Sequence, residues 1–255
     1  MDDQVIRVVM SQMSDVQAQH PGLQLELTPS DGLRLRGPVG FRIEYESRIV
    51  EDTYEIDIQI PDDFPSSPPT VYQIGDKIPP KFQHFFEAGN FCLGAPVEVR
   101  RKFSKHRHLQ RFIDEQVIPY LFAYSYFRDY GRLPFGELGH GFVGLFEFYM
   151  DYFSTNLVET LKLLKLLADN FAPPASLCPC GSGSKLRECH GPRLDALRPH
   201  YPSYLFEAEL LELIEIARQV APSLNVRFPE SSVIPKRIRK QRQRRRRRAK
   251  KWKRG

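Results

Sequence analysis

The chain has 255 residues, of which 41% are hydrophobic and 12% aromatic, enough for one substantial core and one or two small additions. No uninterrupted apolar run approaches the roughly 18 residues that cross a bilayer. The N-terminus, MDDQVIRVVM, has acidic residues where a secretory signal would be basic, and it has no apolar stretch followed by small residues. These features argue against a membrane-spanning or secreted protein and predict a soluble, cytoplasmic one. Three of the four cysteines lie within twelve residues beside a histidine, which in a reducing compartment indicates metal binding rather than disulfides.

The net charge of +6 hides a strong asymmetry along the chain. Residues 236–255 hold 14 of the 37 Lys and Arg and no acidic residue, which leaves 23 basic against 31 acidic residues in the remainder, a balance of −8. The sequence therefore predicts an acidic body followed by a basic tail, which we expect to be disordered when free.

The first expected elements are a helix and a set of strands. Apolar residues recur at helical spacing from Val5 to Val16 and stop at His20-Pro21-Gly22, so we expect an amphipathic helix first. Alternating apolar residues then predict strands at 23–27, 41–45 and 54–60, the last two joined as a hairpin. The pattern favours an antiparallel meander.

A proline-rich segment follows the strands. The stretch IPDDFPSSPPTVY carries four prolines, which remove backbone donors, so it must lie at a sheet edge or in an extended loop. We expect a long irregular region at 75–108, containing the isolated Cys92, because loops of this length are usually functional or disordered. Helical periodicity resumes between Leu109 and Leu121.

The second half of the chain is predicted to be mainly helical. An aromatic-rich stretch at 142–153 and leucines from 157 to 167 predict two helices, the second capped by Asn156 and Glu159. Residues 172–176 have the composition of a linker. A further helix is expected at about 203–220.

The cysteine cluster predicts a structural zinc site. The segment CPCGSGSKLRECH places Cys178, Cys180, Cys189 and His190 as two ligand pairs joined by a glycine-bearing turn, which suits four tetrahedral N or S ligands. It is similar to the SEC-C motif, whose last ligand position accepts Cys or His. Such a zinc knuckle is often a docking surface for protein or nucleic acid, and it leaves no open coordination position for catalysis.

Residues 1–130 resemble a ubiquitin-conjugating enzyme of bacterial type. The likeness rests on the order of elements, on IPDDFPSSPPTVY, and on GNFCLG, which resembles the Gly-x-x-Cys-Leu around the family's active cysteine. The resemblance implies an α+β fold, an antiparallel meander with flanking helices. It also implies transfer of a ubiquitin-like protein, through a thioester on Cys92, to an amine of a target protein, and therefore an activating enzyme as a partner.

His84 stands where this family usually has an asparagine that steadies the oxyanion loop, so the resemblance implies a catalytic role for His84 beside Cys92. A histidine can donate a hydrogen bond to an oxyanion or act as a base. Basic residues between Arg100 and Arg107 would favour the Cys92 thiolate if they approach it. An alternative stays open for both residues, a small buried cysteine and a loop histidine without a catalytic part.

The expected organisation is a ubiquitin-conjugating-like domain at 1–130, a helical extension at 131–171, a SEC-C-like zinc knuckle at 172–195, a C-terminal helix region at 196–234 and the basic tail at 235–255. Bacterial relatives of this type belong to conjugation systems often tied to phage defence. The tail, Lys236 to Arg254, predicts binding to nucleic acid or to an acidic protein surface, including the chain's own body. A solvated tail with no partner is the remaining alternative. The alternative function is a non-catalytic docking module that binds protein or nucleic acid through the knuckle and tail.

Overall fold

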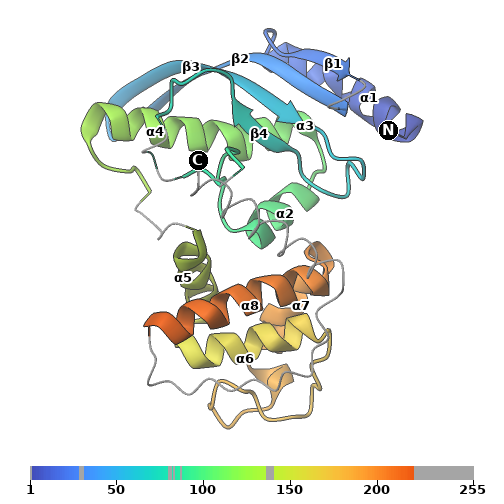
Figure 1. Cartoon of the computed structure of the whole chain (residues 1–255), viewed down its shortest axis with the longest axis vertical. Coiled ribbons are helices and arrows are strands. Elements are labelled where there is room, and N and C mark those ends of the chain that lie inside the picture. The colour runs from blue at the N-terminus through green and yellow to red at the C-terminus, as the bar shows by residue number, and fades with distance from the viewer. Residues whose placement is uncertain are drawn as a thin grey trace, which may run out of the picture. The chain divides into compact units, whose positions relative to one another are not determined.

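The computed structural model describes residues 2–28, 32–79, 82, 84–86, 88–135 and 141–220, and Figure 1 shows how their elements are arranged. The fold is mixed α+β and divides into two compact units. The first unit runs to Tyr152 and includes Asp195–Tyr201, and the second holds Phe153–Leu194 and, of the described residues, those from Pro202 to Val220. No described helix is long and apolar enough to cross a membrane. The basic tail lies outside the described residues.

The first helix, α1, spans Asp3–Gln19 and confirms the expected amphipathic helix. The side chain of Asp2 caps it by accepting a hydrogen bond from the Gln4 N–H at 2.9 Å. It ends at His20, immediately before the proline, and its periodic apolar side chains are buried against the first unit's core.

A four-stranded antiparallel sheet confirms the expected meander, in the order β1-β2-β3-β4. The β2–β3 hairpin turns at Glu46 and Ser47, whose φ angles of 50° and 59° are those of a tight two-residue turn. The second strand begins at Gly32, well before residue 41. Within it, Gly37 lies so close to the Gly22 backbone that a Cβ there would be 2.2 Å from the Gly22 carbonyl oxygen. The strands are β1 Gln24–Thr28, β2 Gly32–Tyr45, β3 Arg48–Gln59 and β4 Thr70–Gln73.

The region expected to be irregular holds one element that the sequence pattern did not reveal. Helix α2 spans Pro96–Ser104, within the 75–108 stretch, so that expectation was wrong there. Proline at the first helical position suits a helix start. Only Val97 and Phe103 are buried, too few apolar positions to establish a helical period, and the helix is held by the core that these two side chains join.

The expected helix after residue 109 is continuous and packs on the sheet. It comprises α3 Leu109–Phe112, a π-helical turn at Ile113–Val117 and α4 Ile118–Tyr130, and α4 runs along one face of the sheet (Figure 1). Aromatic rings join the two layers: Phe122 packs edge-on against Phe41 and Tyr45 of β2, with ring centroids 6.2 and 5.8 Å apart.

The second unit is helical, as expected. Helices α6 and α8 pack side by side (Figure 1) through buried leucine and isoleucine side chains. The Asn156 side chain caps α6 by accepting a hydrogen bond from the Glu159 N–H at 3.1 Å, which confirms the cap expected from the sequence. The helices of the second unit are α6 Leu157–Ala168 and α8 Ser203–Val220. Helix α5 Gly141–Phe153 belongs to the first unit up to Tyr152, and α7 Gly191–Leu197 crosses the boundary between the units after Leu194.

Candidate functional site

The three cysteines and the histidine of the predicted zinc knuckle converge on one point in the second unit. The ligand atoms of Cys178, Cys180, Cys189 and His190 all lie within 4.8 Å of one another. The Cys178 Sγ and the His190 Nδ1 are 3.3 Å apart, and the Cys180 and Cys189 sulfurs are 3.6 Å apart. The structure therefore brings together all four residues that the sequence singled out.

The loop that carries the ligands is closed by its own backbone. Leu177 and Lys185 form an isolated antiparallel β-bridge, and the Cys178 N–H donates to the Ser184 carbonyl at 2.8 Å. Gly181 and Gly183 have φ angles of 79° and 76°, a left-handed conformation that side-chain-bearing residues rarely adopt. The turn between the two ligand pairs thus depends on these glycines.

The segment expected to be a linker takes part in this loop. The Leu186 N–H donates to the Ser176 carbonyl at 2.8 Å, and the Arg187 N–H donates to the Pro174 carbonyl at 3.1 Å. Residues 174–176 are therefore tied to the turn that precedes Cys189, and they hold the second ligand pair against the first.

The orientation of His190 is set by a hydrogen bond outside the ligand cluster. Its Nε2 lies 2.7 Å from the Phe153 carbonyl oxygen, an acceptor, so Nε2 carries the proton and donates it. Its Nδ1, 3.2 Å from the Cys189 sulfur, is then the free ligand atom. Nearby, Arg193 donates to the Ser154 hydroxyl at 3.1 Å, a second link between the loop and the end of α5.

The thiols of the cluster differ in how readily they ionise. Burial raises the pKa of Cys178 to about 11. Burial also disfavours the Cys180 thiolate, but hydrogen bonds from the Ser182 side chain and backbone outweigh it and lower the pKa of Cys180 to about 6. A metal cation must displace the proton from Cys178, so uptake of the metal releases protons.

The donor geometry fits zinc. For a tetrahedral ion with Zn–S near 2.3 Å and Zn–N near 2.0–2.1 Å, neighbouring ligand atoms should lie roughly 3.5 to 3.8 Å apart. Three of the six separations between ligand atoms, at 3.2, 3.3 and 3.6 Å, are close to this spacing, and all six are within 4.8 Å. Four protein ligands would fill the coordination sphere, so zinc here would hold the loop together and would not bind a substrate.

The comparison with known families agrees with this geometry. Residues 176–192 match the SEC-C motif. The match spans the whole ligand cluster and the turn between its two halves, and it covers only this small part of the chain. No curated protein and no solved structure matches the chain.

In the first unit, Cys92 lies in a short loop fastened to the edge of the sheet. Asn90 bridges Tyr72 of β4, and the Phe91 N–H donates to the Val71 carbonyl at 2.8 Å. The Cys92 N–H donates to the His84 carbonyl at 2.8 Å. The backbones of Cys92 and His84, the two residues predicted to be catalytic, are therefore in direct contact.

Tyr120 of α4 fastens the same loop from the other side. Its hydroxyl donates to the His84 carbonyl at 3.0 Å, so that one oxygen accepts hydrogen bonds from both Tyr120 and Cys92. Its ring stacks on Phe91 with centroids 4.4 Å apart and an interplanar angle of 22°. The His84 ring packs against Phe82, with centroids 4.8 Å apart.

The environment of Cys92 favours the neutral thiol. Burial raises the pKa of Cys92 above its ordinary value, and a hydrogen bond from the Gly94 backbone opposes this only in part. No positive charge contributes to this shift among the described residues, so the basic residues from Arg100 to Arg107 do not favour the thiolate in this conformation.

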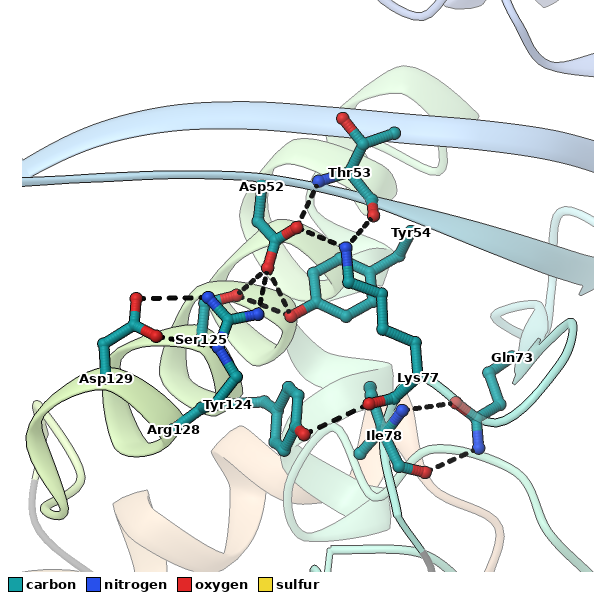
Figure 2. Close-up of polar contacts among 10 residues, drawn as sticks. All are labelled: Asp52, Thr53, Tyr54, Gln73, Lys77, Ile78, Tyr124, Ser125, Arg128 and Asp129. Carbon is teal, nitrogen blue, oxygen red and sulfur yellow. Dashed lines mark hydrogen bonds and ion pairs between the residues drawn. The ribbon is translucent and has the colours of Figure 1, made fainter.

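A polar cluster between β3 and α4 was not foreseen from the sequence. Figure 2 shows the Asp52 carboxylate paired with Lys77 and with Arg128, the latter at 2.6 Å, and hydrogen-bonded to the Tyr54 and Ser125 hydroxyls at 3.0 Å. Burial disfavours the carboxylate, but the bonds from Lys77 and Arg128 outweigh it and keep the pKa of Asp52 well below its usual value. The available signal was an acidic residue on the inward face of a strand, where apolar side chains alternate.

Proposed function

We propose that this chain accepts the C-terminus of a ubiquitin-like protein as a thioester on Cys92 and transfers it to an amine on a target protein. The order of elements supports the proposal: an N-terminal helix, a four-stranded antiparallel meander, a proline-rich passage and then a loop with Gly89-x-x-Cys92-Leu93. This is the layout and the local pattern of the ubiquitin-conjugating enzymes that residues 1–130 resemble.

The proposed chemistry consists of two acyl transfers. The Cys92 sulfur attacks the carbonyl carbon of a donor thioester on the activating enzyme, a new C–S bond forms, and the activating enzyme's thiol leaves with the proton from Cys92. A target amine then attacks the same carbonyl, the C–N bond forms, and the departing Cys92 sulfur recovers a proton from the amine. No metal takes part, and zinc in the SEC-C segment serves the second unit alone.

The hydrogen bond from the Cys92 N–H to the His84 carbonyl is the observation that carries the proposal. It holds the cysteine and the histidine opposite each other across a narrow loop at the sheet edge. The His84 imidazole would donate to the oxyanion that forms as the amine attacks. Because the pKa of Cys92 is raised, its proton must leave as the donor thioester is engaged.

A direct test uses a peptide that ends in Gly-Gly as a thioester of mercaptoethanesulfonate, incubated with the zinc-loaded full chain. We expect an acyl adduct on Cys92, found by mass spectrometry of peptides and reversed by free thiol. Cys92→Ala should carry none. Cys92→Ser should form an oxygen ester that survives the reductant and releases slowly. An equal adduct on the Cys92→Ala variant would refute the assignment.

A second function is favoured by the partial burial of Cys92 and by its raised pKa. In that case the first unit is a non-catalytic docking module, and the SEC-C segment and the basic tail bind protein or nucleic acid. The rate of alkylation of Cys92 in the folded protein separates the two functions. Slow alkylation of Cys92 supports the docking module. The same conclusion follows if acyl transfer to Cys92 is no faster from a larger ubiquitin-like donor than from the thioester peptide.

A further inference from the structure

The first unit carries a second dense group of basic residues that the proposed chemistry does not use. Helix α2 and the turn after it contain Arg100, Lys102, Lys105, His106 and Arg107, which we call the α2 basic surface. Of these, Lys102, Lys105, His106 and Arg107 are exposed. They do not lower the pKa of Cys92, so their grouping calls for another explanation.

The exposed cations Lys102, Lys105 and Arg107 of the α2 basic surface have no acidic partner among the described residues. The single acidic residue of α2, Glu98, is occupied by a two-point ion pair with Arg101, with nitrogen to oxygen distances of 2.7 and 2.8 Å. Among the residues that the structure describes, no carboxylate pairs with Lys102, Lys105 or Arg107. Positive charge therefore accumulates on this side of the unit.

The lowered pKa of His200 is consistent with this accumulation of positive charge. The short helical turn at Arg198–His200 packs against α2, and the His200 Nδ1 lies 2.7 Å from the Ser104 hydroxyl. Its pKa is lowered first by burial and then by the positive charges of Arg101 and Arg107, which Glu98 offsets only in part.

The backbone beneath the surface is held in place. Val97 and Phe103 anchor α2 in the core. Arg107 has a φ of 52°, its N–H donates to the Phe103 carbonyl at 2.8 Å, and its own carbonyl accepts from the Gln12 side chain at 3.3 Å. The cations therefore project from a fixed support, which reduces the ordering that a bound anion would require.

We propose that the α2 basic surface binds the phosphate backbone of nucleic acid without reading its sequence. No large apolar side chain between residues 96 and 108 is exposed, whereas a protein interface usually has an apolar centre. Nucleic-acid interfaces are polar and strongly positive. Helix α2 ends at Ser104, and Lys105, His106 and Arg107 follow it directly, so the exposed cations lie within one short stretch of chain. The α2 basic surface is distant in sequence from the basic tail, and the proposal does not depend on the reactivity of Cys92.

The experiment compares two variants of the full chain, each with three cations replaced by glutamine. One carries Lys102→Gln, Lys105→Gln and Arg107→Gln. The control carries Arg7→Gln, Arg42→Gln and Lys162→Gln, which removes the same charge from exposed positions elsewhere. Both are titrated with labelled 20-nucleotide single-stranded DNA between 50 and 200 mM salt, after circular dichroism and zinc content show that each has folded.

We expect the first variant to lose about two units from the slope of log affinity against log salt, at roughly 0.7 per phosphate contact, and the control to keep the slope. As a second readout, bound DNA should protect Lys102 and Lys105, but not Lys162, from acetylation. An unchanged slope with no protection would mean that the tail carries all binding, and equal losses in both variants would mean that only net charge matters. Either result, or tighter binding to polyglutamate than to DNA, would overturn the proposal.

Discussion

The SEC-C loop and the Cys92 loop both present cysteine, and the difference between them lies in how far apart in the chain their partners are. The candidate metal ligands come from thirteen consecutive residues, with a backbone that closes on itself. The environment of Cys92 is assembled from β4, the loop around His84, and Tyr120 of α4. A cluster of neighbouring ligands can be recognised from their spacing in the sequence. The reactivity of Cys92 depends on residues that are far apart in the chain, so it is decided by how those residues pack.

The largest expected effect concerns the metal. Cys178→Ser should abolish the one zinc per chain and raise hydrogen exchange across residues 176–195, because the loop has little core of its own and structural zinc contributes about 10 kcal/mol or more. Elemental analysis and exchange mass spectrometry measure both effects, with the first unit's sheet as the internal reference. Ser182→Ala, which changes a neighbour of the ligands, should retain zinc. Freshly purified protein without zinc would contradict the assignment.

The next effect isolates the His84 side chain from its backbone. His84→Ala keeps the carbonyl that accepts from Cys92 and removes the imidazole, so loading of Cys92 should survive while discharge to an amine slows by about 10- to 1,000-fold. Single-turnover transfer from loaded Cys92 to free lysine measures the second step. Equal loss of both steps would instead assign His84 to loop positioning.

The pH dependence of Cys92 sharpens the same contrast. Because burial raises its pKa, the thiolate fraction at pH 7 is below that of an ordinary cysteine, and alkylation should accelerate about tenfold per pH unit beyond the usual midpoint near 8.5. Iodoacetamide labelling of the zinc-loaded protein, followed by mass spectrometry from pH 6 to 10, gives this profile. A midpoint of the alkylation profile at or below pH 7 would show that the Cys92 thiolate is activated, and it would contradict the claim that burial raises the pKa of Cys92.

A stability measurement tests whether the polar cluster of Figure 2 supports the Cys92 unit. Asp52→Asn should lower the free energy of unfolding by about 2 kcal/mol, since it weakens charge-assisted hydrogen bonds with partly exposed Lys77 and Arg128. The folded-state pKa of Asp52 is depressed, so the difference from wild type should be constant above about pH 5 and shrink as the pH falls below about 4. Urea denaturation at several pH values checks this, and a difference that grows in acid would contradict it.

The smallest effect is expected at the clamp on the loop. Tyr120→Phe keeps the stacking on Phe91 and removes the hydrogen bond to the His84 carbonyl, so it should cost about 1 kcal/mol and raise exchange at the Cys92 amide. Tyr124→Phe is the matched control, because it removes a hydroxyl that donates to the Lys77 carbonyl instead. Unchanged exchange at Cys92 in the first variant would show that the clamp is not needed.

Sequence patterns anticipated those elements whose burial repeats with a regular period. The α1 stripe from Val5 to Val16 and the alternation in β3 each gave a correct assignment, because one face of each element meets the core. The pattern failed at α2, where two buried side chains establish no period. The end of the proline-rich stretch was expected at a sheet edge or in an extended loop, and Thr70–Gln73 forms the edge strand β4. The candidate zinc ligands could be predicted from the sequence because two closely spaced ligand pairs joined by a short turn are typical of a structural zinc site.

The features established by the sequence are therefore local: the meander, the helices with a clear apolar period, and four candidate metal ligands on one short turn. The tertiary structure decided the electrostatic questions. It placed the basic residues from Arg100 to Arg107 where they do not affect the pKa of Cys92, and it placed the partly buried Asp52 between Lys77 and Arg128. The physical reason is that charge interactions depend on distance and burial, and these are known only once distant segments have packed together.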